Sequence, residues 1–271
     1  MKKFLAITLV LILLLSIVAC NKNDSETGDG EITAATTAEA KHVYQDEGST
    51  DKFGYDVNAQ GDYDITSFEC VDEMHAVVIP SEIGGIPVTG IADEAFKSKW
   101  QITEIVIPDT VKTIGVAAFY DCKYLTKVTM ANSVTKIKEA AFKDCIALTG
   151  LTLPSGLVEI GDGAFFGCTG LKDIKFTDSL TTIGKGAFQN CTALESVTIS
   201  ASVKEIKGGA FQGCDALKSI KIPATVETLG EYVFASPLAG KNDFKIIAAE
   251  NSAAAIYAAE NGYVLETYAA E

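Results

Sequence analysis

The chain has 271 residues and a formal net charge of −14 at pH 7, and all 22 of its basic residues are lysine. Proteins that bind nucleic acids need a basic surface and favour arginine at their contacts. The composition therefore argues against nucleic acid as a partner, and its acidity disfavours attraction to an anionic membrane surface.

The first predicted element is a short apolar leader. Two lysines precede an apolar run from Phe4 to Ala19, which is shorter than the roughly 20 residues of a membrane span. We therefore predict a secretory signal over residues 1–19. The Ala19-Cys20 junction resembles the cleavage site of a bacterial lipoprotein, which implies that Cys20 becomes a lipidated N-terminus. The alternative is an ordinary secretory signal in which Cys20 is incidental.

Residues 20–51 follow as a polar, acidic segment that is poor in large apolar side chains. Such a segment buries too little surface to offset the entropy of ordering, so we predict a disordered tether. Residues 52–90 are then predicted to form an N-terminal cap. Within this cap we expect a hairpin over Phe53–Glu69, because Asn58 to Asp62 supplies residues typical of a turn.

Residues 91–240 carry an internal repeat with a period of 23 residues, which is typical of a solenoid. Seven phenylalanines mark it: Phe96, Phe119, Phe142, Phe165, Phe188, Phe211 and Phe234. An aliphatic column accompanies them: Ile91, Ile114, Ile137, Ile160, Ile183, Ile206 and Leu229. Both columns are expected to form the core.

Each repeat contains three predicted parts. Ile174 and Phe176 alternate with polar residues, and this period of two indicates a half-buried β-strand. A second apolar pair, such as Val134 and Ile137, suits a shorter strand on the opposite wall. The Ala-Phe-x-x-Cys segment is short enough for one helical or 3₁₀ turn, and a glycine such as Gly184 precedes it in four repeats.

The recurring Leu-x-x-Ile-x-Ile-Pro, Val-x-x-Ile-Gly and Ala-Phe-x-x-Cys segments, as in Leu217–Pro223, Val226–Gly230 and Ala210–Cys214, resemble the BspA-like leucine-rich repeats of bacterial surface proteins. The resemblance covers roughly residues 52–268. It implies a right-handed superhelix of short parallel β-strands joined by short helical turns. It also implies display at a cell surface and a role in adhesion.

Five cysteines occupy one repeat column, three residues after each phenylalanine: Cys122, Cys145, Cys168, Cys191 and Cys214. One interpretation is a metal or redox ladder. The other, which we prefer, is a buried small residue copied with the repeat. The chain has no Cys-x-x-Cys, and His42 and His75 lie outside the column. Cys70 has no counterpart in the repeat.

Residues 241–271 are predicted to cap the other end of the stack. Ser252 is expected to cap a short helix from Ala253 to Asn261, with Gly262 as its stop and a final strand at Val264. Such caps cover the open edges of a solenoid.

The sequence offers no support for catalysis, since it lacks a Gly-x-Ser-x-Gly elbow, a phosphate loop and His-Glu-x-x-His. We expect no catalytic residues, no cofactor and no metal ion.

If the longer strands line one exposed wall, its outward residues are predictable. We predict a binding face made of Glu104, Lys127, Thr129, Asp173, Lys175, Ser196, Thr198, Ser219 and Lys221. These residues are small or polar and include no aromatic. Trp100, Tyr120, Tyr124 and Phe166 are further aromatic candidates near the turns, either for a ligand or for packing between repeats.

We therefore expect a monomeric, lipid-anchored extracytoplasmic protein at the bacterial membrane or cell surface. Its partner is expected to be a protein or another macromolecule. The alternative is a structural lipoprotein that spaces the envelope and has no specific ligand.

Overall fold

The structure is a computed structural model that describes residues 42–47, 49–70, 73–234 and 244–269. All of them belong to one compact unit, Ala40–Glu271. The predicted leader, Cys20 and residues 20–41 of the predicted tether lie outside the described residues. Within the described ranges, no helix is both long and apolar enough to cross a membrane.

The N-terminal cap begins earlier than the sequence predicted. The hairpin is confirmed as β2 (Lys52–Val57) and β3 (Tyr63–Glu69), which pair antiparallel. However, β1 (His42–Tyr44) pairs antiparallel with β2, so these three residues do not belong to a tether that extends to residue 51. The composition of residues 20–51 gave no signal for this strand, because the segment is long and polar. Tyr44, which packs against the core, is a single large side chain within it.

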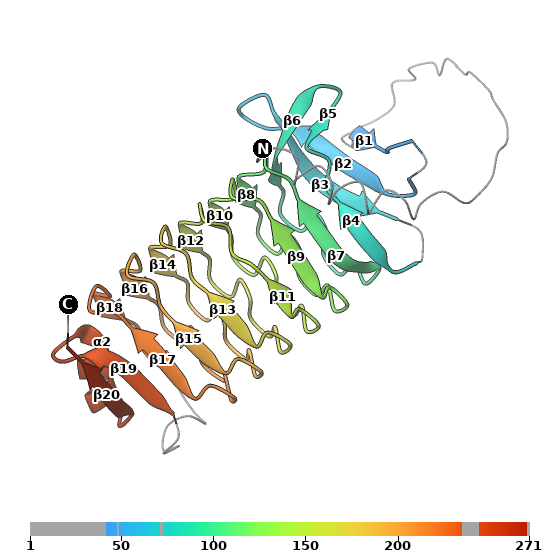
Figure 1. The fold of residues 1–271 in the computed structure, drawn as a ribbon. Helices are drawn as coiled ribbons and strands as arrows, with labels where there is room; N and C mark the ends of the chain where they lie inside the picture. Colours follow the sequence, from blue (N-terminus) through green and yellow to red (C-terminus); the bar gives the residue numbers. More distant parts are fainter. Residues whose placement is uncertain (1–41, 48, 71–72, 235–243, 270–271) are drawn as a thin grey trace, which may run out of the picture. The chain divides into compact units, whose positions relative to one another are not determined.

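The repeats stack as rungs with strands on two walls, as Figure 1 shows. The long-strand wall consists of parallel strands, each from a successive rung. Its strands are β4 (His75–Val78), β7 (Ile102–Ile107), β9 (Lys127–Met130), β11 (Gly150–Leu151), β13 (Asp173–Lys175), β15 (Ser196–Thr198), β17 (Ser219–Ile222), β19 (Lys245–Ala249) and β20 (Val264–Tyr268).

The short-strand wall is the opposite side of each rung and continues the sheet of β1, β2 and β3. Its parallel strands are β6 (Ile86–Ile91), β8 (Thr113–Ile114), β10 (Lys136–Ile137), β12 (Glu159–Ile160), β14 (Thr182–Ile183), β16 (Glu205–Ile206) and β18 (Thr228–Leu229). A short strand, β5 (Glu82–Ile83), pairs antiparallel with β6.

The two predicted columns form the core between these walls. All seven phenylalanines are fully buried, and rings of successive rungs lie with centroids 4.8–6.0 Å apart. The six isoleucines of the aliphatic column are buried, and Leu229 is partly buried. The predicted solenoid and its register are therefore confirmed.

The corners that carry the phenylalanines are turns interrupted by left-handed residues. The Tyr120 N–H donates to the Ala117 carbonyl at 3.0 Å, as in a 3₁₀ turn. Ala117 and Asp121, however, have φ angles of 52° and 61°, which a continuous helix does not allow. The Phe119 N–H donates instead to the Ala141 carbonyl of the next rung at 2.7 Å. The corners thus add a third hydrogen-bonded side to the stack.

The glycine that precedes the corner in four repeats serves close packing rather than an unusual φ angle. A Cβ at Gly184 would lie 2.4 Å from the carbonyl carbon of Gly161 in the preceding rung. The left-handed φ, 59°, occurs two residues later at Gly186. This glycine column therefore marks a place where the backbones of adjacent rungs approach too closely for a side chain.

The cysteine column consists of buried thiols. Each of the five side chains is fully buried, and none is in a disulfide. Each Sγ lies 3.1–3.3 Å from a phenylalanine carbonyl oxygen of the rung before and donates to it. Burial raises the pKa of the Cys122 and Cys214 thiols to about 12. The interpretation as a duplicated core residue is therefore confirmed.

These thiols should be unreactive until the chain unfolds. We expect the folded protein to shield all five from a thiol reagent, and the denatured, unreduced protein to expose them. Because unfolded thiols ionise near their ordinary pKa of 9.0 while the folded ones stay neutral, the free energy of unfolding should fall as the pH rises above about 9. Loss of titratable thiols without a reductant would contradict this assignment.

The C-terminal cap follows the prediction closely. The helix α2 (Ala253–Glu260) begins after Ser252, whose side chain accepts a hydrogen bond from the Ala255 N–H. Gly262 has a φ of 71° and ends the turn before β20. This strand pairs in parallel with β19, so it adds a last strand to the long-strand wall.

Candidate binding surface

The outward side of the long-strand wall, here called the strand face, contains all nine residues predicted for binding. Eight of them are exposed, and Ser219 is half-buried. Alternation explains this result, since the intervening residues Ile105, Val128, Ile174, Val197 and Ile220 are buried. The sequence therefore predicted this face correctly at the level of side-chain orientation.

The strand face forms two rows in which residues of successive rungs lie side by side. In one row Asp173 pairs with Ser196, and Ser196 with Ser219. In the other row Lys175, Thr198 and Lys221 are neighbours. Both rows continue onto the C-terminal cap. The sequence predicted this cap but not that it would extend the strand face. The added residues are Lys245 and Val264 in the first row, and Ile247 and Glu266 in the second.

Charges on this face pair only weakly. The Lys127 Nζ lies 3.6 Å from the Glu104 Oε2, and the Lys245 Nζ lies 3.1 Å from the Glu266 Oε2, with all four side chains about half exposed. Surface ion pairs of this kind contribute about 0–1 kcal/mol. These charges are therefore available to an external partner at little cost to the fold.

The long-strand wall is interrupted in its middle. Strand β11 pairs with β9, but β11 and β13 belong to different sheets, whereas β12 and β14 remain paired on the short-strand wall. Two residues near the break depart from the repeat pattern. Gly150 has no side chain to pack on the strand, and Phe176 replaces the aliphatic residue found in the other rungs.

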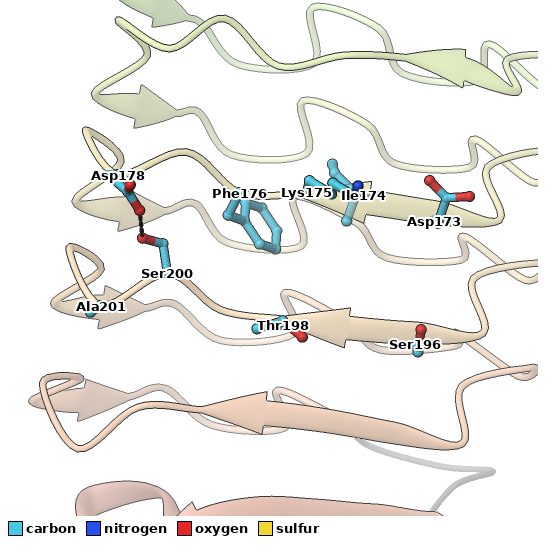
Figure 2. A pocket seen from close by; sticks show the side chains of 9 residues that line it. All are labelled: Asp173, Ile174, Lys175, Phe176, Asp178, Ser196, Thr198, Ser200 and Ala201. Carbon is cyan, nitrogen blue, oxygen red and sulfur yellow. Dashed lines mark hydrogen bonds between the residues drawn. The ribbon is translucent and has the colours of Figure 1, made fainter. Parts of the chain in front are cut away.

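Beside this break the strand face is hollowed into an open depression of about 510 Å³. Figure 2 shows the Phe176 ring among polar side chains from two neighbouring rungs. Asp178 accepts a hydrogen bond of 2.9 Å from the Ser200 hydroxyl across these rungs. The lining residues are Asp173, Ile174, Lys175, Phe176, Asp178, Ser196, Thr198, Ser200 and Ala201.

Phe176 corrects the expectation that this surface lacks an aromatic residue. Its side chain is half-buried, and its ring meets Phe188 edge to face at a centroid distance of 5.6 Å. The sequence signal was present, because Phe176 is the only aromatic in a column otherwise filled by Ile107, Met130, Leu153, Ile199 and Ile222. Its alternation with polar residues predicted an inward position on a half-buried strand, so its partial exposure was not expected.

The four other aromatic candidates divide into two pairs. Trp100 and Tyr124 are 44% and 51% exposed. Tyr120 and Phe166 are half-buried, and the Lys143 Nζ lies 4.7 Å from the Phe166 ring centroid. Tyr120 and Phe166 therefore lie along the corners with the Lys143 side chain over both rings. This arrangement agrees with packing between repeats.

The comparisons with known proteins agree with this architecture. The profile of the BspA type leucine rich repeat region matches residues 89–216 and 135–247, with six copies of the repeat. The chain belongs to the BspA-type leucine-rich-repeat family. This membership agrees with the repeated rungs, but it does not identify a ligand.

Solved structures of leucine-rich-repeat proteins show how far the likeness extends. A leucine rich repeat protein from T. pallidum is 28% identical, with a TM-score of 0.64, over 81% of this chain and 97% of that one. A leucine-rich repeat protein from Bacteroides ovatus is 23% identical, with a TM-score of 0.53, over 79% of this chain and 66% of that one. The search of curated proteins found no match to this chain.

Proposed function

We propose that this protein is a lipid-anchored extracytoplasmic binding module that holds a macromolecular partner on its strand face. The observation that carries the proposal is the half-buried Phe176 in a depression rimmed by polar side chains. Binding interfaces commonly place an aromatic anchor within a polar rim. A ligand that uses Phe176 as an anchor extends along the polar rows of the neighbouring rungs.

The geometry of the strand face favours an extended partner over a small molecule. Its exposed residues lie on both sheets of the long-strand wall, and the depression is open rather than enclosed. Because most of the face is polar, each rung supplies a weak contact, and the affinity is summed over several rungs. A non-catalytic role in adhesion or protein binding suits such a surface.

The anchor and the location rest on the leader sequence. Cys20 at the end of the apolar run supports lipidation, and several acyl chains hold a protein at a membrane at about 0.8 kcal/mol per buried CH₂. A spacer lipoprotein without a ligand remains the competing function. The partly exposed aromatic on the strand face favours the binding module.

Charge reversals on the strand face should weaken binding in proportion to the number of rungs affected. The chain from Ala40 onward, which forms one compact unit, is used to capture partners from host matrix extracts and intact bacteria. Lys175→Glu should lower the affinity about 5-fold, the effect of about 1 kcal/mol for an exposed ion pair. Lys127→Glu combined with Lys221→Glu should lower it about 25-fold, because distant sites add in free energy.

The contrary result is equally specific. A tight small-molecule ligand that is lost on one substitution in a single rung would replace the extended-surface proposal by a pocket. Failure to capture any partner at all would favour the spacer function.

A further inference from the structure

We propose that Asp51, Cys70 and His75 form a site for a zinc-class divalent metal ion in the N-terminal cap. Each offers one ligand atom, and these atoms all lie within 4.8 Å of one another. They come from three places in the fold. Asp51 directly precedes β2, Cys70 directly follows β3, and His75 is the first residue of β4.

The hydrogen bonds of His75 leave one ring nitrogen directed at the site. Its Nδ1 lies 2.8 Å from the backbone carbonyl oxygen of Glu73. A carbonyl oxygen only accepts, so Nδ1 carries a proton and donates it. In the neutral ring, Nε2 then presents a lone pair. This second-shell bond from one ring nitrogen to a carbonyl is the usual support of a metal-binding histidine.

The atom that faces this lone pair is another acceptor. The His75 Nε2 lies 2.7 Å from the Asp51 Oδ1, and a carboxylate has no proton to share. Asp51 is only 9% exposed, and a buried charge of this kind requires a counter-charge. Either His75 takes up a second proton or a cation lies between the two groups. The nearby Cys70 sulfur favours the cation.

The ligand set selects the type of metal. Thiolate, imidazole and carboxylate together suit Zn²⁺, whereas Mg²⁺ and Ca²⁺ prefer oxygen ligands alone. Bond lengths of about 2.0–2.3 Å place tetrahedral ligand atoms roughly 3.3–3.7 Å apart. The His75–Asp51 contact, now 2.7 Å, must therefore open by roughly 0.6–1.0 Å. An open depression of about 280 Å³ borders Cys70, the one of the three residues that lines it, and we expect a fourth ligand such as water to come from that side.

The site would join the two walls of the solenoid at their first rungs. Strands β2 and β3 belong to the sheet of the short-strand wall, and β4 belongs to the long-strand wall. A bound ion would link these walls at the cap, while the buried column thiols stay bonded to backbone carbonyls. This proposal departs from the expectation that the chain holds no metal, because the sequence showed no ligand spacing around Cys70.

The test measures metal binding by the purified full chain in a phosphine reductant. We expect one Zn²⁺ per chain after gel filtration, release of the Cys70 thiol proton on binding, and a rise in melting temperature with Zn²⁺ but not with Mg²⁺. Co²⁺ in place of Zn²⁺ should give a thiolate-to-cobalt charge-transfer band in the near ultraviolet. Cys70→Ser should abolish that band, and His75→Gln should lower the affinity more than about tenfold, since even second-shell changes cost that much.

His42→Gln is the matched control. His42 also faces a carboxylate in this cap, with its Nδ1 3.7 Å from the Asp56 Oδ1, but both side chains are mostly exposed. The control should bind Zn²⁺ as the unaltered chain does. A chain that retains no stoichiometric Zn²⁺, or binds Co²⁺ without the thiolate band, would overturn the proposal and leave a protonated His75 paired with Asp51. Equal losses in His42→Gln and His75→Gln would overturn it as well. The Zn²⁺ content and the cobalt band of the unaltered chain test the proposal even if a variant fails to fold.

Discussion

Phe165→Ala should lower the free energy of unfolding by about 3–5 kcal/mol, the usual cost of removing a buried phenylalanine. Phe165 is fully buried in the middle of the stack. Its ring lies between those of Phe142 and Phe188, with centroids 5.4 and 5.3 Å away. The truncation therefore removes ring contacts on both sides and leaves a cavity that neighbouring rungs cannot fill without moving.

Phe166→Ala provides the control for this change. Phe166 is the next residue in the chain, but its ring is only half-buried and lies near the Lys143 ammonium group. We expect a cost of about 1 kcal/mol, in line with an exposed cation–π contact. Denaturant melts of both variants measure the difference. Equal losses would mean that the assigned register of the repeat is wrong.

Cys20→Ala should move the protein from the membrane to the soluble extracytoplasmic fraction. The apolar run before Cys20 is too short to span a membrane, so lipid on Cys20 is the expected anchor. Fractionation of cells that express each form, followed by a high-salt wash, measures the change. The unaltered protein should resist the wash, because salt screens charges and leaves buried acyl chains in place.

Two outcomes would contradict the lipid anchor. Retention of Cys20→Ala at the membrane in high salt would place the anchor elsewhere in the chain. A soluble unaltered protein would favour the ordinary secretory signal, in which Cys20 is incidental.

The repeat made most of the fold predictable from the sequence. A column such as Ile114, Ile137 and Ile160 fixes the register, because equivalent residues of successive rungs must pair in a parallel stack. Alternation within the long strands then determined which side chains face outward. The caps were predictable where a single residue has a strong local preference, as Ser252 has for the N-cap of α2.

The remaining features depend on contacts between rungs or between distant segments. The left-handed residues at Ala117 and Asp121 are not glycines, and the bonds from the corner to the next rung hold them in this conformation. Phe176 occupies a core column, yet its side chain is only half-buried and lines the depression between the rungs of β13 and β15.

The candidate metal site was harder still to predict from the sequence. Asp51 and His75 are 24 residues apart, and they meet only because the start of β2, the end of β3 and the start of β4 lie on the same side of the cap. No local motif carries this information, since neither residue belongs to the repeat.

The central claim is that the strand face binds the partner, and a comparison of the two walls tests it most directly. The capture experiment is repeated with Lys136→Glu and Lys204→Glu on or beside the short-strand wall. This pair makes the same change in net charge as Lys127→Glu with Lys221→Glu. Lys136 and Lys204 have carboxylate neighbours, Glu159 and Glu227, at 2.7 and 3.9 Å, as Lys127 has in Glu104. We expect the strand-face pair to lose most of the bound partner and the opposite pair to retain it. Equal loss from both pairs, or loss only from the opposite pair, would contradict the claim.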